Sequence, residues 1–143
     1  MRNRTLLVSS VLVAATVLSG CGSQSLSSTP DTSAPPADVV DLSSVNFEVH
    51  TGQAAVQVDA VDNAFKPEYV EVSAGTAVTF RNDGRNDHNV IPVDAASFAA
   101  IQAEQFLPGT EATVTFAEPG DYPYYCSLHG TKTKGMIGAI RVT

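Results

Sequence analysis

The sequence predicts an all-β fold for residues 46–143, a Greek-key antiparallel sandwich or barrel. From about residue 54 onward, apolar and polar residues alternate in short runs, which is the period of a half-buried strand. Residues that favour turns separate these runs at short intervals. Many short alternating strands joined by such turns are typical of an antiparallel sandwich or barrel.

Six segments are predicted to be strands, and the alternation within them indicates which side chains face the core. The segments are residues 54–60, 69–72, 76–81, 112–116, 121–126 and 137–142. Because successive side chains of a strand point to opposite faces, one parity class is predicted to be buried. That class contains Val70, Val72, Val78, Phe80, Val114 and Phe116, and the opposite class contains Glu71, Thr79, Thr113 and Thr115.

The segments between these strands contain residues that interrupt β-structure. The separators are Lys66-Pro67, Ala74-Gly75, Asn82-Asp83-Gly84, Pro108-Gly109 and Glu118-Pro119-Gly120. Only residues 94–104 suggest a helix, since they are rich in alanine and place Phe98 and Ile101 three positions apart. We therefore expect a short helix in residues 94–104.

Residues 1–20 have the layout of a secretory signal peptide. Arg2 and Arg4 give a positive start, and residues 6–18 are almost wholly apolar. A membrane-spanning helix needs roughly 20 apolar residues, so this run is too short for a typical transmembrane helix. The motif Leu18-Ser19-Gly20-Cys21 resembles the lipobox of bacterial lipoproteins, whose cysteine is lipidated and becomes the first residue of the mature chain. The alternative is an ordinary signal peptide followed by a chance cysteine.

Residues 21–45 are predicted to be a flexible linker that carries the lipid anchor at Cys21. They are rich in Ser, Thr, Pro, Ala and Asp, so they cannot bury enough apolar surface to offset their ordering entropy. Lipidation with more than one acyl chain suffices for stable anchoring. We therefore expect an extracytoplasmic domain that is anchored by lipid to a bacterial cell membrane.

The net charge excludes some classes of partner. The whole chain has a formal charge of −7, and removal of residues 1–20 leaves six basic residues against fifteen acidic ones, a charge of −9. Such a balance argues against binding to nucleic acid and against direct attraction to anionic lipid. The polar surfaces that this chain would attract are cationic.

One cysteine and two histidines stand out chemically. If Cys21 is acylated, Cys126 has no disulfide partner in an oxidising compartment, so its presence there requires another explanation. His129 follows Cys126 by three residues, and His88 stands at the start of another apparent strand. The third histidine, His50, has no motif around it and is expected to be solvated.

These residue types allow three kinds of chemistry. One cysteine, two histidines and a distant methionine, here Met136, form the ligand set of a blue-copper electron-transfer site. A zinc site is an alternative, but a tetrahedral zinc ion would lack a strong fourth ligand unless an aspartate joined. A cysteine nucleophile activated by His129 is the third alternative, although no orienting third residue or oxyanion motif accompanies it.

A resemblance to a known family favours copper. The segments GDYPYYCSLH (residues 120–129) and GMIGAIRV (residues 135–142) look like the copper-binding end of the plastocyanin branch of the cupredoxins. His88-Asn89-Val90 is similar to the first-ligand motif of that branch, and Phe65-Lys66-Pro67 with residues 72–80 resembles its early strands. The motifs occur in family order from about residue 54 to residue 143.

The resemblance implies that His88 and His129 supply nitrogen ligands, Cys126 the thiolate and Met136 the weak axial thioether. It also implies that Asn89 ties the two ligand loops together by hydrogen bonding, a contact that fixes the ligands and tunes the metal. One departure is the six-residue gap between His129 and Met136, which is longer than in the plastocyanin pattern. Met136 still precedes the last predicted strand, which is the family's position for the axial ligand.

The implied function is the transfer of single electrons between a redox donor and a redox acceptor, through one type 1 copper per chain. We expect a monomer that is not an enzyme. A nitrite reductase or multicopper oxidase would need a further copper site with several more histidines, and only His50 is left over. A copper carrier or delivery lipoprotein would use the same ligands, but such carriers generally have exposed Met-rich or His-rich tracts, and the only methionines are Met1 and Met136.

Overall fold

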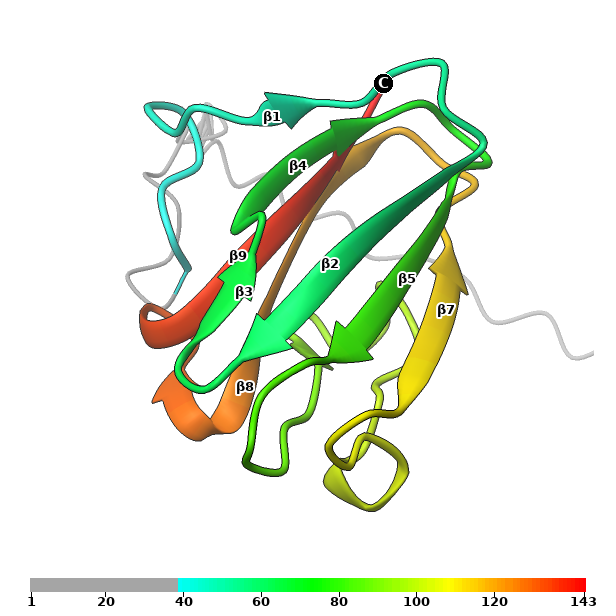
Figure 1. The fold of residues 1–143 in the computed structure, drawn as a ribbon. Coiled ribbons are helices and arrows are strands. Elements are labelled where there is room, and N and C mark those ends of the chain that lie inside the picture. Colours follow the sequence, from blue (N-terminus) through cyan, green and yellow to red (C-terminus); the bar gives the residue numbers. More distant parts are fainter. Residues whose placement is uncertain (1–38) are drawn as a thin grey trace, which may run out of the picture. The chain divides into compact units, whose positions relative to one another are not determined.

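The computed structural model describes residues 39–143, which form two β-sheets packed face to face (Figure 1). One sheet has the strand order β1-β4-β9-β8-β6, and the other has the order β3-β2-β5-β7. Among residues 39–143, no helix has the length and apolar character needed to cross a membrane. The predicted signal peptide, Cys21 and residues 21–38 of the predicted linker lie outside the described residues.

All six predicted strands are present, and three short strands accompany them. The first sheet contains β1 (Glu48–Val49), β4 (Tyr69–Val72), β6 (Ile91–Pro92), β8 (Gly120–Thr131) and β9 (Lys134–Val142). The second contains β2 (Ala55–Val61), β3 (Ala64–Lys66), β5 (Ala77–Asn82) and β7 (Glu111–Thr115). Strands β1, β3 and β6 have only two or three residues each, too few to show a periodicity.

The all-β sandwich is confirmed, but its sheets are mixed rather than purely antiparallel. The pairs β1–β4, β4–β9 and β2–β5 are parallel, and the pairs β2–β3, β5–β7, β6–β8 and β8–β9 are antiparallel. Alternation along a strand indicates which face is buried, but it does not indicate the direction of the neighbouring strand. The parallel pair β2–β5 arises because the chain crosses to the other sheet at β4 before it returns at β5.

The core lies between the two sheets and contains the predicted parity class. Four of its members are completely buried, namely Val70, Val72, Val78 and Phe80, and Phe116 is nearly so. Val114 is half-buried and packs against this core. Of the residues predicted to face outward, Thr113 and Thr115 are exposed, whereas Glu71 and Thr79 are half-buried.

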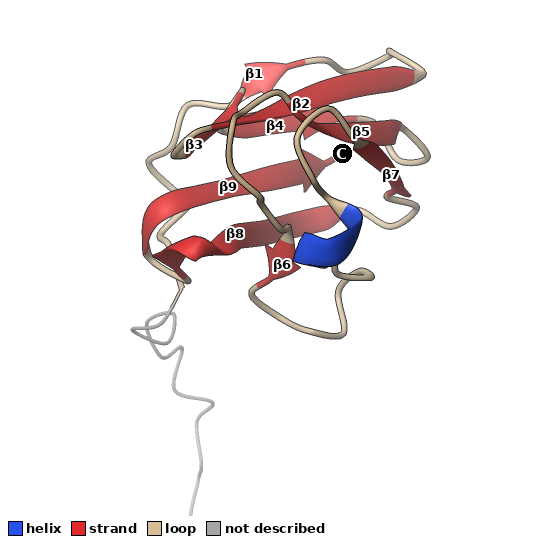
Figure 2. Ribbon diagram, turned by 60° about the horizontal axis from the view of Figure 1, so that its bottom comes forward, coloured by secondary structure: helices blue, strands red, loops and turns tan. Residues whose placement is uncertain are grey.

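The short helix predicted for residues 94–104 is reduced to one 3-10 turn, η1 (Ala103–Gln105), drawn in blue in Figure 2. The chain turns earlier at Asp94, whose carboxylate accepts the N–H of Ala96 at 3.0 Å. Val90 and Ile101 then form an isolated antiparallel bridge with N–H···O distances of 2.9 and 3.0 Å. This bridge holds the backbone extended at Ile101, so a helix cannot continue through that residue.

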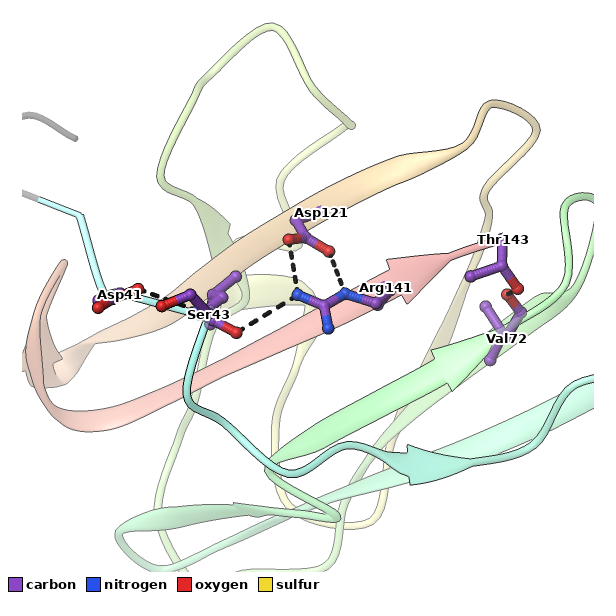
Figure 3. A network of polar contacts seen from close by, with 7 residues as sticks. Asp41, Ser43, Val72, Asp121, Arg141 and Thr143 are labelled. Atoms are coloured by element: carbon purple, nitrogen blue, oxygen red, sulfur yellow. Dashed lines mark hydrogen bonds and ion pairs between the residues drawn. The ribbon is translucent and has the colours of Figure 1, made fainter. Parts of the chain in front are cut away.

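Residues 39–47 lie against the first sheet, where Arg141 of β9 holds them (Figure 3). The guanidinium of Arg141 donates two hydrogen bonds to the carboxylate of Asp121, at 2.7 and 2.9 Å, and one to the carbonyl of Leu42, at 3.4 Å. The same guanidinium lies 4.0 Å from the centre of the Phe47 ring, a cation–π contact. Residues that the sequence assigns to the linker therefore pack on the sandwich at Leu42, which is buried.

Candidate metal centre

Three of the predicted ligands converge at one end of the sandwich, where β5 ends and β8 reaches its hairpin (Figure 1, bottom). His88 lies in the connection between β5 and β6, while Cys126 and His129 belong to β8. The ligand atoms of these three residues all lie within 4.8 Å of one another. Nδ1 of His88 is 3.7 Å from Sγ of Cys126, and Nδ1 of His129 is 3.5 Å from the same sulfur.

A large bulge in β8 brings the hairpin ligands together. On one side of the bulge Tyr125 pairs with Ile137, and on the other side Gly130 pairs with Gly135. Between these pairs β8 has the four residues 126–129, whereas β9 has only Met136. An excess of residues on one strand bends it and re-aims its side chains. The register of the hairpin therefore places Cys126 and His129 opposite Met136.

The six residues between His129 and Met136 form the end of this hairpin. Pairing of Thr131 with Lys134 continues the two strands beyond the bulge, so the extra length is ordered β-structure. Gly130 and Gly135 are packed too closely for side chains, because a Cβ on Gly130 would lie 2.7 Å from the backbone N of Met136. The six-residue connection therefore does not displace Met136 from its position opposite the bulge of β8.

Met136 is completely buried and belongs to the same hydrophobic cluster as Cys126. Methionine is unbranched and carries a polarisable thioether, which is a weak ligand as well as a good core residue. Its position on β9, opposite residues 126–129, directs it to the same end of the sandwich as the other three ligands.

The spacing of the donor atoms fits a single metal ion. Metal–sulfur bonds of about 2.3 Å and metal–nitrogen bonds of about 2.0–2.1 Å, at angles of about 110–120°, separate sulfur and nitrogen by about 3.6–3.8 Å. The two observed separations are 3.5 and 3.7 Å. One thiolate and two imidazoles with a nearby thioether also match the softness that copper prefers.

Burial differs among the three ligands that converge at this end. His88 and Cys126 are completely buried, and His129 is half-buried. Burial lowers the pKa of His88, and the neighbouring His129 adds to this effect, while Asp62 and Asp87 oppose it. The lowered pKa favours the neutral imidazole of His88, which is the form that binds metals.

Asn89 forms two hydrogen bonds with Ser127. Its Nδ2 donates to Oγ of Ser127 at 2.8 Å, and its Oδ1 accepts the N–H of Ser127 at 2.8 Å. Ser127 is the neighbour of Cys126 in the bulge of β8. The two bonds therefore tie the backbone next to His88 to the backbone next to Cys126.

One histidine lies outside the metal centre, and one asparagine beside the centre was not among the predicted site residues. His50 takes no part in the centre, since its ring bonds Glu48 at 2.8 Å and Gln53 at 3.1 Å. Asn82 stands out only in the structure, because its sequence context assigns it to a turn. It is completely buried at the end of β5, and its side chain bonds the loop that leads to His88. Asn82 lies two residues after Phe80 and so shares the inward parity of that residue, which is the one sequence signal of its burial.

The family described as copper binding proteins, plastocyanin/azurin family, matches residues 52–143. The chain belongs to this family. Its cofactor is copper, and His88, Cys126, His129 and Met136 form an arrangement typical of a type 1 copper site.

Plastocyanins are among the curated relatives of this family member. The chain is 36% identical over 89 residues to plastocyanin B'/B'' of Nicotiana tabacum, covering 55% of this chain and 87% of the relative. It is 34% identical over 88 residues to the plastocyanin of Solanum crispum, again covering 55% of this chain and 87% of the relative.

Solved cupredoxin structures resemble this plastocyanin/azurin-family chain in fold. A reduced amicyanin variant matches with a TM-score of 0.53 at 27% identity, covering 62% of this chain and 82% of the amicyanin. A copper-containing nitrite reductase from Thermus scotoductus matches with a TM-score of 0.52 at 31% identity. That match covers 62% of this chain and only 22% of the reductase.

Proposed function

We propose that this protein is an extracytoplasmic type 1 copper protein that carries single electrons between redox partners. His88, His129 and Cys126 would be the equatorial ligands, and Met136 the axial one. The observation that carries the proposal is the completely buried thiol of Cys126 with one imidazole Nδ1 at 3.5 Å and another at 3.7 Å. Bound copper would supply the Cu(II)/Cu(I) couple.

The chain contributes a rigid set of donors that need not move when the charge at the centre changes. His88, Cys126 and Met136 are fully enclosed by the core, and the pair of bonds between Asn89 and Ser127 joins the backbone beside His88 to that beside Cys126. Preorganised groups need little rearrangement at the moment of reaction. A small rearrangement favours rapid exchange of electrons in both directions.

The exchange of electrons is assigned to the edge of His129. This is the only one of the four proposed ligands that reaches solvent in the part of the chain that the structure describes. Its neighbour Leu128 is 53% exposed, so an apolar side chain stands beside it. A partner that docks there would bring its own centre close to the imidazole without opening the site.

The rival functions are disfavoured by the composition and by the burial of the donors. The chain has three histidines, and His50 is engaged with Glu48 and Gln53, which leaves no set of ligands for a second copper site of an enzyme. A copper carrier or delivery lipoprotein is the alternative function. Carriers exchange their metal through accessible donors, whereas Cys126 and Met136 are both completely buried.

The location proposed for this carrier is the outer side of a bacterial cell membrane. The support is the signal-like residues 1–20 and the lipobox-like cysteine Cys21 that follows them. The formal charge of −9 that remains without residues 1–20 favours redox partners with cationic surfaces and argues against nucleic acid.

The test is a copper titration of the full chain, purified in detergent, followed by visible absorption. An intense band near about 600 nm that ascorbate bleaches and an oxidant restores is expected for a Cys-ligated copper. The Cys126→Ser variant is the control and should lack the band. Absence of the band in the unaltered protein, together with ready loss of copper to a chelator, would overturn the proposal in favour of delivery.

A further inference from the structure

Apart from the contact of its Nδ1 with Sγ of Cys126, the ring of His88 has no hydrogen bond in the described part of the chain that would fix its orientation. Its Nε2 is buried and has no hydrogen-bond partner among residues 39–143. Histidines that bind metals usually donate this second N–H to a carboxylate, a carbonyl or a water, which fixes the orientation of the ring. The orientation of His88 must therefore depend on the groups packed against it.

The backbone of Gly84 is one such group. A Cβ placed on Gly84 would lie 3.0 Å from Nε2 of His88 and 2.8 Å from the backbone N of Asp62. Gly84 thus fills the space between the ring and the β2–β3 turn, with no room even for a methyl group. A shift of Gly84 would change the space that is available to the ring.

Asn82 holds Gly84 in this position. It is the last residue of β5 and is completely buried. Its Oδ1 accepts the N–H of Gly84 at 3.1 Å, and its Nδ2 donates to the carbonyl of Asn86 at 2.9 Å. One amide therefore fixes both the beginning and the end of the loop that leads to His88.

The same amide also bonds the backbone of Phe106, which accepts a hydrogen bond from the main chain of His88. Nδ2 of Asn82 donates a second hydrogen bond to the carbonyl of Phe106, at 2.8 Å. That carbonyl accepts the N–H of His88 at 3.4 Å. The main chain of Asn82 adds two bonds to this region, to Thr110 at 2.9 Å and from Gly109 at 2.8 Å. Asn82 is thus bonded both to the loop that precedes His88 and to residues 106–110.

We propose that Asn82 is a positioning residue for His88, which sets the ring through Gly84 and the main chain through the carbonyl of Phe106. This inference rests on the proposed function, because it takes His88 to be a copper ligand. The Asn82 side chain itself does not bind the metal.

The test compares Asn82→Ala with Thr76→Val as a matched control. Thr76 lies just before β5, at the opposite end of the strand, and is 3% exposed. Its hydroxyl donates to the carbonyl of Gln53 at 3.1 Å. Each variant removes one buried polar anchor of the same strand, but only the first is near His88. Asn82→Ser, with a hydroxyl that allows a bridging water, replaces Asn82→Ala if that variant fails to fold.

The first readout is the copper centre of the full chain. Loss of Cu(II) to a chelator should be about tenfold or more faster in the Asn82 variant than in Thr76→Val, since loss of outer contacts weakens metal sites by about 10-fold to 100-fold. The copper hyperfine splitting in the electron paramagnetic resonance spectrum should change in the Asn82 variant alone. Equal rates and equal spectra in both variants would overturn the role of Asn82.

The second readout uses the copper-free protein, so that failure of the proposed function remains distinguishable. The Cε1–H resonance of the His88 ring in NMR spectra should be a single sharp peak in the unaltered protein. It should broaden or split in the Asn82 variant but remain single in Thr76→Val. An unchanged resonance would refute the inference, whereas a missing thiolate band in the unaltered loaded protein would refute the proposed function instead.

Discussion

Replacement of Gly135 by alanine should distort the hairpin that carries His129. Gly135 has φ +83°, and a Cβ at this position would lie 2.6 Å from the carbonyl oxygen of His129 and 2.9 Å from Cα of Gly130. Both atoms belong to the backbone, so no side chain can rotate to relieve the overlap. The strands themselves must separate.

The expected loss of stability has two contributions. A left-handed conformation costs a residue with a Cβ about 1–2 kcal/mol. Separation from 2.6 Å to the 3.4 Å of an ordinary contact would require a shift of 0.8 Å at His129. Overpacking of this kind costs about 1–3 kcal/mol. We therefore expect Gly135→Ala to lower the free energy of unfolding by about 2–5 kcal/mol in total.

Two other glycines separate these contributions. Gly75 has φ +85° and no atom within 4 Å of the place where a Cβ would lie, so Gly75→Ala should show only the conformational cost, about 1–2 kcal/mol. A Cβ on Gly130 would lie 2.7 Å from the carbonyl of Lys134, and this glycine has no positive φ, so Gly130→Ala should show only the overlap. The free energies come from urea unfolding of the copper-free proteins.

The copper spectrum distinguishes displacement of the ligand from simple instability. Gly135→Ala should change the visible and electron paramagnetic resonance spectra, because the displaced carbonyl belongs to His129 itself. Gly75→Ala should leave both spectra unchanged. Equal losses of stability in Gly135→Ala and Gly75→Ala, with identical spectra, would refute the close packing of the hairpin.

Three further variants test other parts of the centre. Met136→Leu preserves the size of a completely buried side chain and should shift the reduction potential; an unchanged potential and spectrum would remove Met136 from the site. Asn89→Ala removes two 2.8 Å bonds to Ser127 and should speed copper loss about tenfold while the visible band persists. An unaltered copper affinity and reduction potential in Asn89→Ala would contradict this role of Asn89. Tyr124→Phe removes a buried hydroxyl with no partner among the described residues, so the free energy of unfolding should rise by about 1 kcal/mol or stay constant. A marked decrease in denaturant titrations would reveal a bonded hydroxyl.

The strands were predictable because local pattern encodes them, and the proposed ligands were identified from motifs that the family resemblance supplies. Alternation places Val78 and Phe80 on one face of a strand whatever its neighbours are, and both are completely buried. The ligand motifs are equally local, since Cys126 and His129 lie within one segment of β8. The hydrogen bonds of Asn89 also follow from its place beside His88, a position that the family resemblance specifies.

The features that escaped prediction depend on contacts between distant segments. Parallel pairing of β2 with β5 is decided by the route of the chain through β3 and β4. The helix expected near residue 100 is prevented by the bridge between Val90 and Ile101. Asn82 resembles a turn residue in the sequence because it begins the run Asn82-Asp83-Gly84. Its parity with Phe80 indicates an inward position, but its hydrogen bonds to Phe106 and to the loop before His88 appear only in the folded chain.

The four proposed ligands divide into one rigid group and one separate residue. Cys126, His129 and Met136 belong to a single hairpin, so a distortion of that hairpin should move them relative to one another. His88 comes from a different connection and is joined to the hairpin through Asn89 and to its own loop through Asn82. Variants of the hairpin glycines should therefore alter the Cys–His–Met geometry, and hence both the band position and the potential. Variants of Asn82 and Asn89 should instead loosen one nitrogen ligand, so copper loss should accelerate more than the potential changes.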